Sequence, residues 1–154
     1  MEIRRINQSE ADLVTMLFDK YRVFYKQQSD IYTVRKFIHT RLANNESAIF
    51  VALDNIAGEI IPAGFTQLYP TYSSVRVVKN WILNDLYVDS SYRKQGIGEK
   101  LIRVAMKFAK ENDAKYVQLE TAIDNYTAQS LYERIGFIKQ PPDIDYYTYK
   151  VAIE

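Results

Sequence analysis

Residues 88–101 have the sequence VDSSYRKQGIGEKL, which runs from an apolar, strand-like segment through a glycine loop into an amphipathic helix. In this context the backbone N–H groups of the loop and the helix N-terminus can point together at an anion. Gly96 and Gly98 let the backbone approach a phosphate without obstruction by side chains. The loop is neither a Walker loop, because no Gly-Lys-Ser/Thr ends it, nor a GxGxxG fingerprint, because Leu101 replaces the third glycine. The two glycines alone would also suit an ordinary strand-to-helix turn.

Helical and strand-like segments are interleaved on both sides of this loop. Apolar residues at helical spacing predict four helices, over residues 10–25, 30–42, 99–110 and 127–134. Short apolar runs predict seven strands, over residues 2–6, 48–53, 60–68, 81–88, 116–121, 137–140 and 145–153. Strands interrupted by helices in so short a chain imply a mixed α/β sheet with at least one parallel crossover. No linker or internal repeat is evident, so we expect a single domain over residues 1–154.

Composition excludes several classes of function. The 20 Lys and Arg residues nearly balance the 19 Asp and Glu residues, so the sequence gives no reason to expect a nucleic-acid partner. The absence of cysteine excludes thiolate metal sites and cysteine nucleophiles, and the single histidine, His39, excludes a multi-histidine metal site. His39 is expected at the boundary or on the surface of its helix. No apolar run of signal-peptide length follows Met1, which favours a cytoplasmic protein without a membrane partner.

Two motifs, which follow one another along the chain, resemble the motifs of one enzyme family. Arg93-x-x-Gly96-x-Gly98 is similar to the Q/R-x-x-G-x-G/A signature of the GNAT superfamily of acetyl-CoA-dependent N-acetyltransferases. Downstream, residues 125–137, NYTAQSLYERIGF, resemble the N-x-x-A-x-x-L-Y-x-x-x-G-F segment of the same family. The resemblance implies a central mixed, mostly antiparallel sheet of seven strands with about four helices, splayed after Val88 to admit acetyl-CoA.

The resemblance also implies cofactor-binding residues. The backbone of Leu86, Tyr87 and Val88 would pair with the pantetheine and hold the acetyl carbonyl. Arg93 and the loop from Lys94 to Glu99 would surround the pyrophosphate. The full set for this role is Leu86, Tyr87, Val88, Arg93, Lys94, Gln95, Gly96, Ile97, Gly98, Glu99 and Asn125, the last contacting the coenzyme A arm.

Two residues are candidates for catalysis. Tyr132 matches the tyrosine acid of the family, which would protonate the departing thiolate; a tyrosine here could instead be a core aromatic of a short helix. The segment 83–88 is similar to a strand of spermidine/spermine acetyltransferases, but Asn84 replaces their glutamate, and Ile82 is not acidic either. Asp85 is then the acidic candidate: it could bind the substrate ammonium, relay its proton through water, or make a buried structural hydrogen bond.

Tyr21, Arg22, Tyr25 and Tyr69 are the candidate substrate-binding residues. The phenol rings together with Asp85 would suit a cationic amine, whereas Arg22 favours a substrate that carries a carboxylate. The tyrosines could equally cover the sheet with their rings and leave their hydroxyls in water.

The sequence therefore predicts an N-acetyltransferase that acetylates a primary amine of a small molecule, such as a polyamine or an amino acid. A protein or peptide amine is the nearest variant, and a non-catalytic acetyl-CoA-binding module is the alternative from another class. Related enzymes are often homodimers, and the segment Tyr146-Tyr147-Thr148-Tyr149 could supply an interface strand or a core-facing strand.

Overall fold

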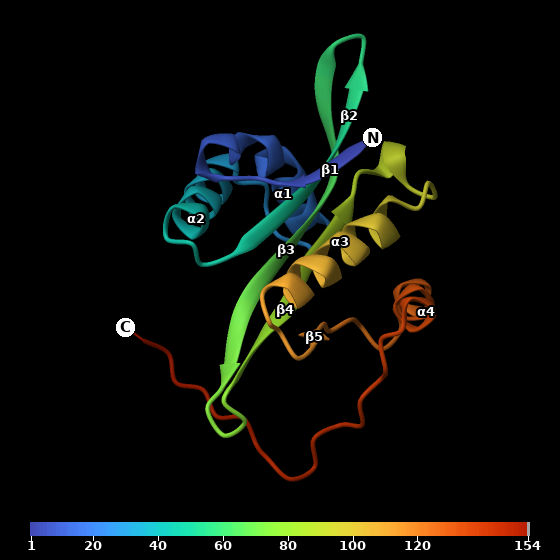
Figure 1. Cartoon of the computed structure of the whole chain (residues 1–154). Helices are drawn as coiled ribbons and strands as arrows, with labels where there is room; N and C mark the ends of the chain where they lie inside the picture. The colour runs from blue at the N-terminus through green and yellow to red at the C-terminus, as the bar shows by residue number, and fades with distance from the viewer. Residues whose placement is uncertain (154) are drawn as a thin grey trace. The chain divides into compact units, whose positions relative to one another are not determined.

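The computed structural model describes residues 1–153 and divides into two units, Met1–Glu120 and Thr121–Glu154, which we describe separately. The strands, all in the first unit, are β1 (Glu2–Arg5), β2 (Ala48–Ile56), β3 (Glu59–Ser73), β4 (Val78–Val88) and β5 (Val117–Gln118) (Figure 1). The helices of that unit are η1 (Gln8–Glu10), α1 (Asp12–Phe24), α2 (Ile31–Ala43), η2 (Ser90–Tyr92) and α3 (Ile97–Glu111), and the second unit holds α4 (Tyr126–Ile135). The mixed α/β class and the four expected α-helices are confirmed.

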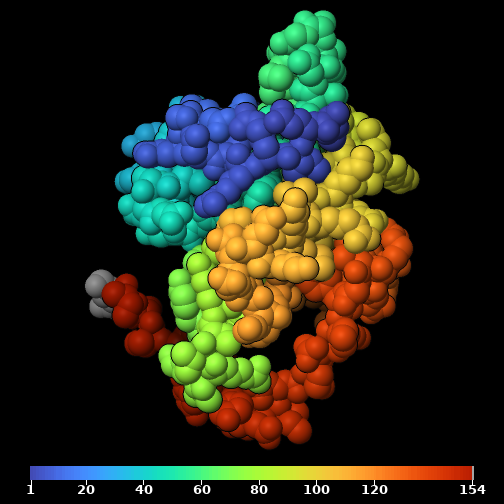
Figure 2. Space-filling model, viewed as in Figure 1, coloured from blue at the N-terminus to red at the C-terminus, as the bar shows by residue number. Residues whose placement is uncertain are grey.

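The sheet has the order β1-β2-β3-β4-β5, with three antiparallel pairings and a parallel one between β4 and β5. Strands β2 and β3 form a hairpin through Ala57 and Gly58, whose φ angles of 52° and 87° are both positive. A two-residue turn with two positive φ angles matches the twist of paired strands. The hairpin end projects beyond α1 in Figure 2.

The strand count differs from the prediction, because the described residues form five strands and not seven. The run 116–121 is a strand only at Val117–Gln118, and residues 137–140 and 145–153 form none (Figure 1). Their alternating apolar residues have strand propensity, but a strand also needs a neighbour that supplies backbone hydrogen bonds. In this structure their large side chains are exposed, Tyr147 by 91% and Tyr149 by 89%.

Helices cover both faces of the sheet in the first unit. On one face, Phe18 of α1 stacks on Phe65 of β3, with ring centroids 5.5 Å apart. On the other, Phe108 of α3 contacts Phe50 of β2, with centroids 5.4 Å apart. Phe50 pairs with Thr66, the residue next to Phe65 in β3. Because successive side chains of a strand point to opposite faces, Phe50 and Phe65 lie on opposite faces of the sheet. We call these the α1 face and the α3 face.

Caps fix several helix ends. Asn7 caps η1 in a reciprocal arrangement with Glu10, and the Asp30 side chain accepts a hydrogen bond from the Thr33 N–H at the start of α2. In the second unit, Asn125 caps α4, and Gly136 ends it with a φ of 119°.

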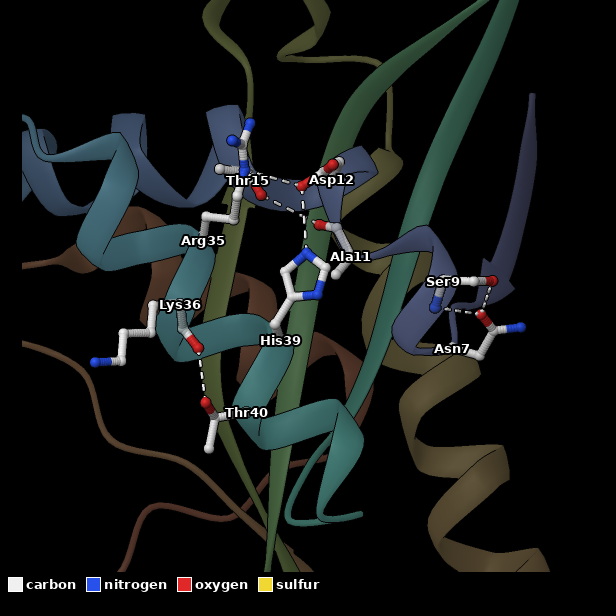
Figure 3. Close-up of polar contacts among 9 residues, drawn as sticks. All are labelled: Asn7, Ser9, Ala11, Asp12, Thr15, Arg35, Lys36, His39 and Thr40. Atoms are coloured by element: carbon white, nitrogen blue, oxygen red, sulfur yellow. Dashed lines mark hydrogen bonds and ion pairs between the residues drawn. The ribbon is translucent and has the colours of Figure 1, made fainter.

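His39 lies on the exposed side of the contact between α1 and α2. Its Nε2 is 3.4 Å from Oδ1 of Asp12, which also accepts a hydrogen bond from Arg35 Nε at 3.1 Å (Figure 3). The ring is partly exposed, as the sequence predicts. None of the helices in residues 1–153 is both long and apolar enough to cross a membrane.

Candidate functional site

A β-bulge in β4 places Asp85 on the α1 face of the sheet. Leu68 of β3 pairs with Leu83, but the preceding residue, Gln67, pairs with Asp85, so Asn84 is the extra residue of β4. In a regular ladder Asn84 would lie opposite Gln67, and Asp85 would lie on the α3 face. The Thr66 hydroxyl donates a 2.8 Å hydrogen bond to the Asp85 carbonyl and fixes the backbone at the bulge.

The Asp85 side chain is buried among polar groups from three directions. Gln67 Nε2 donates to Oδ2 at 2.7 Å, and Asn84 Nδ2 donates to Oδ1 at 3.0 Å. The Tyr21 hydroxyl of α1 is also hydrogen-bonded to this carboxylate, and Tyr69 of β3 lies close enough to feel its charge. The residue is only 4% exposed. The structure thus brings together three of the predicted site residues, Tyr21, Tyr69 and Asp85.

Burial controls the proton affinities in this cluster. It raises the pKa of the Asp85 carboxyl above its ordinary value, although the hydrogen bonds from Gln67, Tyr21 and Asn84 oppose the rise. Burial also raises the pKa of the Tyr21 and Tyr69 phenols, and the nearby carboxylate adds to both shifts. The phenols therefore stay neutral at physiological pH and keep their O–H donors. A buried carboxyl with a raised pKa takes up a proton at a higher pH than an exposed one does.

The other two predicted substrate-binding residues lie on the outer side of this cluster. The Tyr25 ring meets the Tyr21 ring edge-on, with centroids 5.0 Å apart, and is 57% exposed. Arg22 donates from Nη1 to the Gln28 carbonyl at 3.2 Å, and so holds the loop between α1 and α2. Arg22, Lys26 and Gln28 line an open depression of about 480 Å³ along that loop.

The end of β4 separates from its parallel neighbour. Within the described residues, the ladder between β4 and β5 covers only Trp81 and Ile82. From Leu86 to Val88 the strand keeps its pairing with β3, through Thr66, Phe65 and Gly64. The parallel pairing of β4 therefore ends at Ile82, ahead of the segment expected to pair with pantetheine.

The loop after β4 has the geometry of an anion cradle. Lys94 and Gly96 both have left-handed backbone conformations, with φ angles of 61° and 75°. No side chain caps α3, and its first intrahelical bond runs from the Lys100 N–H to the Gly96 carbonyl. The amides of Ile97 and Gly98 therefore precede the helical ladder. A Cβ at Gly98 would contact only Val88 Cγ2, at 3.9 Å, so the helix start is open on that side.

These residues fit a pyrophosphate. Backbone amides, a helix N-terminus and the exposed side chains of Arg93, Lys94 and Gln95 surround the same loop. Ile97 is buried and can contribute only its backbone. The Glu99 carboxylate accepts hydrogen bonds from both Nε and Nη2 of Arg103, at 3.0 and 2.7 Å, and so forms an i,i+4 ion pair on α3.

Side chains also fix the position of the cradle. Asp89, at the end of β4, accepts hydrogen bonds from Lys20 Nζ of α1 at 2.5 Å and from the Ser91 hydroxyl at 2.7 Å. The hydrogen bond from Lys20 is the largest cause that lowers the pKa of Asp89, to about 2. Arg93 Nε donates to the Val88 carbonyl at 3.1 Å. The cradle is thus tied to α1 by an ion pair and to β4 by a hydrogen bond.

The remaining predicted residues belong to the second unit. The Asn125 Oδ1 accepts the Ala128 N–H at 3.2 Å as the cap of α4. Tyr132 is half-buried in the same helix, and its ring packs edge-on against Phe137 with centroids 6.0 Å apart.

Sequence reasoning missed Gln67, Lys20 and Gly64. Gln67 could have been noticed as a large polar residue inside the apolar run 63–68. A Cβ at Gly64 would lie 2.8 Å from the Tyr87 carbonyl oxygen, so this glycine permits the close approach of β3 to the end of β4. No local pattern marks Lys20, because its partner Asp89 is 69 residues away.

Comparisons with known proteins decide the family. The model of the Acetyltransferase (GNAT) family matches residues 12–137 of the chain. The chain belongs to the GNAT family. The uncharacterized N-acetyltransferase YhfO of Bacillus subtilis (strain 168) is 44% identical over 137 residues, which cover 89% of each chain.

Two further matches extend this result. The crystal structure of a probable acetyltransferase superposes with a TM-score of 0.87 and 37% identity over 100% of both chains. Human N-alpha-acetyltransferase 30 is 33% identical over 132 residues, which cover 84% of this chain and 34% of the human protein. This GNAT protein is accordingly an N-acetyltransferase, and its acetyl donor is acetyl-CoA, for which the cradle at the end of β4 has suitable chemistry.

Proposed function

We propose that this enzyme transfers the acetyl group of acetyl-CoA to a primary amine of a small molecule, of the polyamine or amino acid class, by direct attack in a ternary complex. The observation that carries the proposal is the buried Asp85 carboxyl between the phenols of Tyr21 and Tyr69. A carboxylate in such surroundings can bind an ammonium group and take its proton. Aromatic rings add cation–π attraction of about 0.5–2 kcal/mol per contact.

The proposed reaction balances with groups of this chain. The amine nitrogen bonds to the acetyl carbonyl carbon while the carbon–sulfur bond breaks. Asp85 takes a proton from the bound ammonium, directly or through water, and releases it to solvent before the neutral amine attacks. The second proton leaves the nitrogen by the same route, and Tyr132 gives a proton to the thiolate and regains one from solvent. Acetyl-CoA supplies the activated acyl group as a thioester.

We propose that the cofactor residues keep the roles implied by the family motifs. The backbone of Leu86 to Val88 pairs with pantetheine, the loop from Arg93 to Glu99 binds the pyrophosphate, and Asn125 contacts the coenzyme A arm while capping α4. Tyr21, Tyr25 and Tyr69 form the acceptor pocket with Arg22 at its edge. The family match spans residues 12–137, which supports one acetyltransferase domain across both units.

A second candidate acceptor is the α-amine of a protein or peptide. The similarity to human N-alpha-acetyltransferase 30, over 84% of this chain, favours it. The open depression beside Arg22 and Lys26 would suit the carboxylates of an acidic peptide as well as those of an amino acid.

A thiol-release assay with acetyl-CoA tests the proposal against polyamines, amino acids, aminosugars and peptides with free N-termini. We expect turnover with a small amine, with kcat/KM rising with pH through the ionisation of Asp85. Because burial raises the pKa of Asp85, that rise should lie above pH 4, the ordinary range of an aspartic acid. Turnover confined to peptides would establish the second candidate instead.

A further inference from the structure

Gln67 is a fully buried amide whose side chain contacts the proposed proton acceptor. Its exposed fraction is 0%, and it lies directly across the ladder from Asp85. Its Nε2 donates to Asp85 Oδ2 at 2.7 Å. A buried amide costs free energy unless its polar atoms are paired, so packing alone does not account for a glutamine at this position.

Only one side of this amide is used. The Gln67 Oε1 atom is buried and has no hydrogen-bond partner in residues 1–153. Buried side-chain acceptors without a partner are uncommon in folded proteins. The amide thus presents a donor to Asp85 and keeps an unused acceptor on the same sp² group.

This pair of atoms suits a carboxyl that changes its protonation state. An ionised carboxylate accepts hydrogen bonds, whereas the protonated acid also has an O–H to donate. The Gln67 amide can donate N–H to the first form and, after a half-turn of the amide, accept the O–H of the second with Oε1. Methionine at this position could serve neither form.

We propose that Gln67 is a positioning residue that orients Asp85 in both protonation states and thereby sets the pH at which Asp85 accepts a proton. This inference rests on the proposed role of Asp85 as proton acceptor. The titratable groups that face Asp85 are Tyr21 from α1 and Tyr69 from β3. Tyr25 interacts electrostatically with the Tyr21 phenol and Arg41 with the Tyr69 phenol, so these two groups affect Asp85 only through its neighbours.

The test compares wild-type enzyme with Gln67→Met and Gln67→Glu by two readouts. One is ¹³C NMR titration of the Asp85 carboxyl, assigned by its loss in Asp85→Asn, and the other is the pH profile of kcat/KM. Gln67→Met removes a donor to a charged group, so Asp85 should titrate about one to two pH units higher. The acidic limb of the pH profile of kcat/KM should move to higher pH by the same amount, and the KM for acetyl-CoA should not change.

Gln67→Glu keeps the shape of the side chain and serves if the methionine variant does not fold. Two facing carboxyls would share a proton, so the pair should also take up its proton at higher pH than Asp85 does in wild type. Asn80→Leu is the matched control, because Asn80 is a buried amide of β4 whose Oδ1 accepts the N–H groups of Lys115 and Tyr116. It should lower the melting temperature and leave the Asp85 titration in place.

The outcomes separate the two levels of the proposal. If both Gln67 variants leave the Asp85 titration unchanged and only lower the melting temperature, as Asn80→Leu does, Gln67 is a packing residue and the inference is wrong. If Asp85→Asn retains the wild-type pH profile, the proposed role of Asp85 fails, whatever the NMR titration of the Gln67 variants shows. Matching shifts in both readouts would support both.

Discussion

Single residues determine the chemistry of this protein more than any extended motif does. Asp85 is an ordinary acid in the sequence, and it becomes a candidate base because burial raises its pKa while three neighbouring side chains hydrogen-bond to it. Under the proposed function, Gly98 and Tyr132 are the two positions where a single substitution should separate binding of acetyl-CoA from the chemical step.

Gly98→Glu should abolish binding of acetyl-CoA and leave the fold intact. A Cβ at this position meets only Val88 Cγ2, at 3.9 Å, and a carboxylate in the first turn of a helix is favourable for the helix. The same carboxylate would repel a pyrophosphate at the amides of Ile97 and Gly98. Isothermal calorimetry measures the affinity and circular dichroism the fold; an affinity equal to that of wild type would exclude the cradle as the cofactor site.

Tyr132→Phe should lower kcat by about 10²- to 10⁴-fold with little change in the affinity for acetyl-CoA. The substitution keeps the ring that packs on Phe137 and removes only the hydroxyl, so stability should change little. Steady-state kinetics with the best acceptor from the screen, together with calorimetry, checks the result. Wild-type turnover in this variant would show that another group protonates the thiolate.

At the scale of elements, α1 is joined to both halves of the proposed site. Tyr21 reaches Asp85, and the preceding residue, Lys20, pairs with Asp89 at the start of the cradle. Movement of α1 should therefore affect the acceptor pocket and the cofactor loop together.

Lys20→Met should lower the melting temperature at pH 7 by about 2–4 °C, as expected for the loss of about 1 kcal/mol in a chain of this length. The paired Asp89 has its pKa lowered to about 2, so the stability it contributes is complete above its ordinary pKa of about 4 and is lost as pH falls towards 2. The difference in melting temperature between Lys20→Met and wild type, measured by thermal denaturation, should therefore become smaller as the pH falls from about 4 to about 2. Lys107→Met is the control, because Lys107 and Glu111 form an exposed pair 3.7 Å apart; an equal effect of the two substitutions would contradict the prediction.

Prediction from the sequence succeeded for elements whose signals are local. Asp30 and Gly136 mark helix ends through chemistry that is confined to a few neighbouring residues, whereas the role of Asn125 as the cap of α4 was not predicted. The bulge at Asn84 was not predictable, because it depends on the pairing of β4 with β3, residues that lie far apart in the sequence. The strands expected in residues 137–140 and 145–153 were wrong, because apolar residues at alternate positions show strand propensity and not the presence of a partner strand.

At the scale of the whole molecule, the C-terminal segment exposes apolar side chains at alternate positions. Tyr147, Tyr149, Val151 and Ile153 are each more than 80% exposed. In an extended chain such residues share one face, which would be buried if the segment paired with another strand. We therefore propose a homodimer in which this segment contributes to the interface.

The protein should elute as a dimer in size-exclusion chromatography with light scattering at micromolar concentration. The double substitution Tyr149→Asp and Val151→Asp should give a monomer, because it places two charges on the apolar face. Tyr32→Asp is the control, since Tyr32 is 78% exposed on α2 of the other unit and should leave the dimer unchanged. A wild-type monomer at high concentration would contradict the proposal.

The bulge in β4 also bears on how this enzyme is aligned with its relatives. Column by column, Asn84 and Asp85 are separate positions, yet the extra residue gives Asp85 the place opposite Gln67 that Asn84 would occupy in a regular strand. An acidic residue can therefore stand one alignment position further along this strand and still occupy the same place in the fold, provided that the backbone accommodates the extra residue in a bulge.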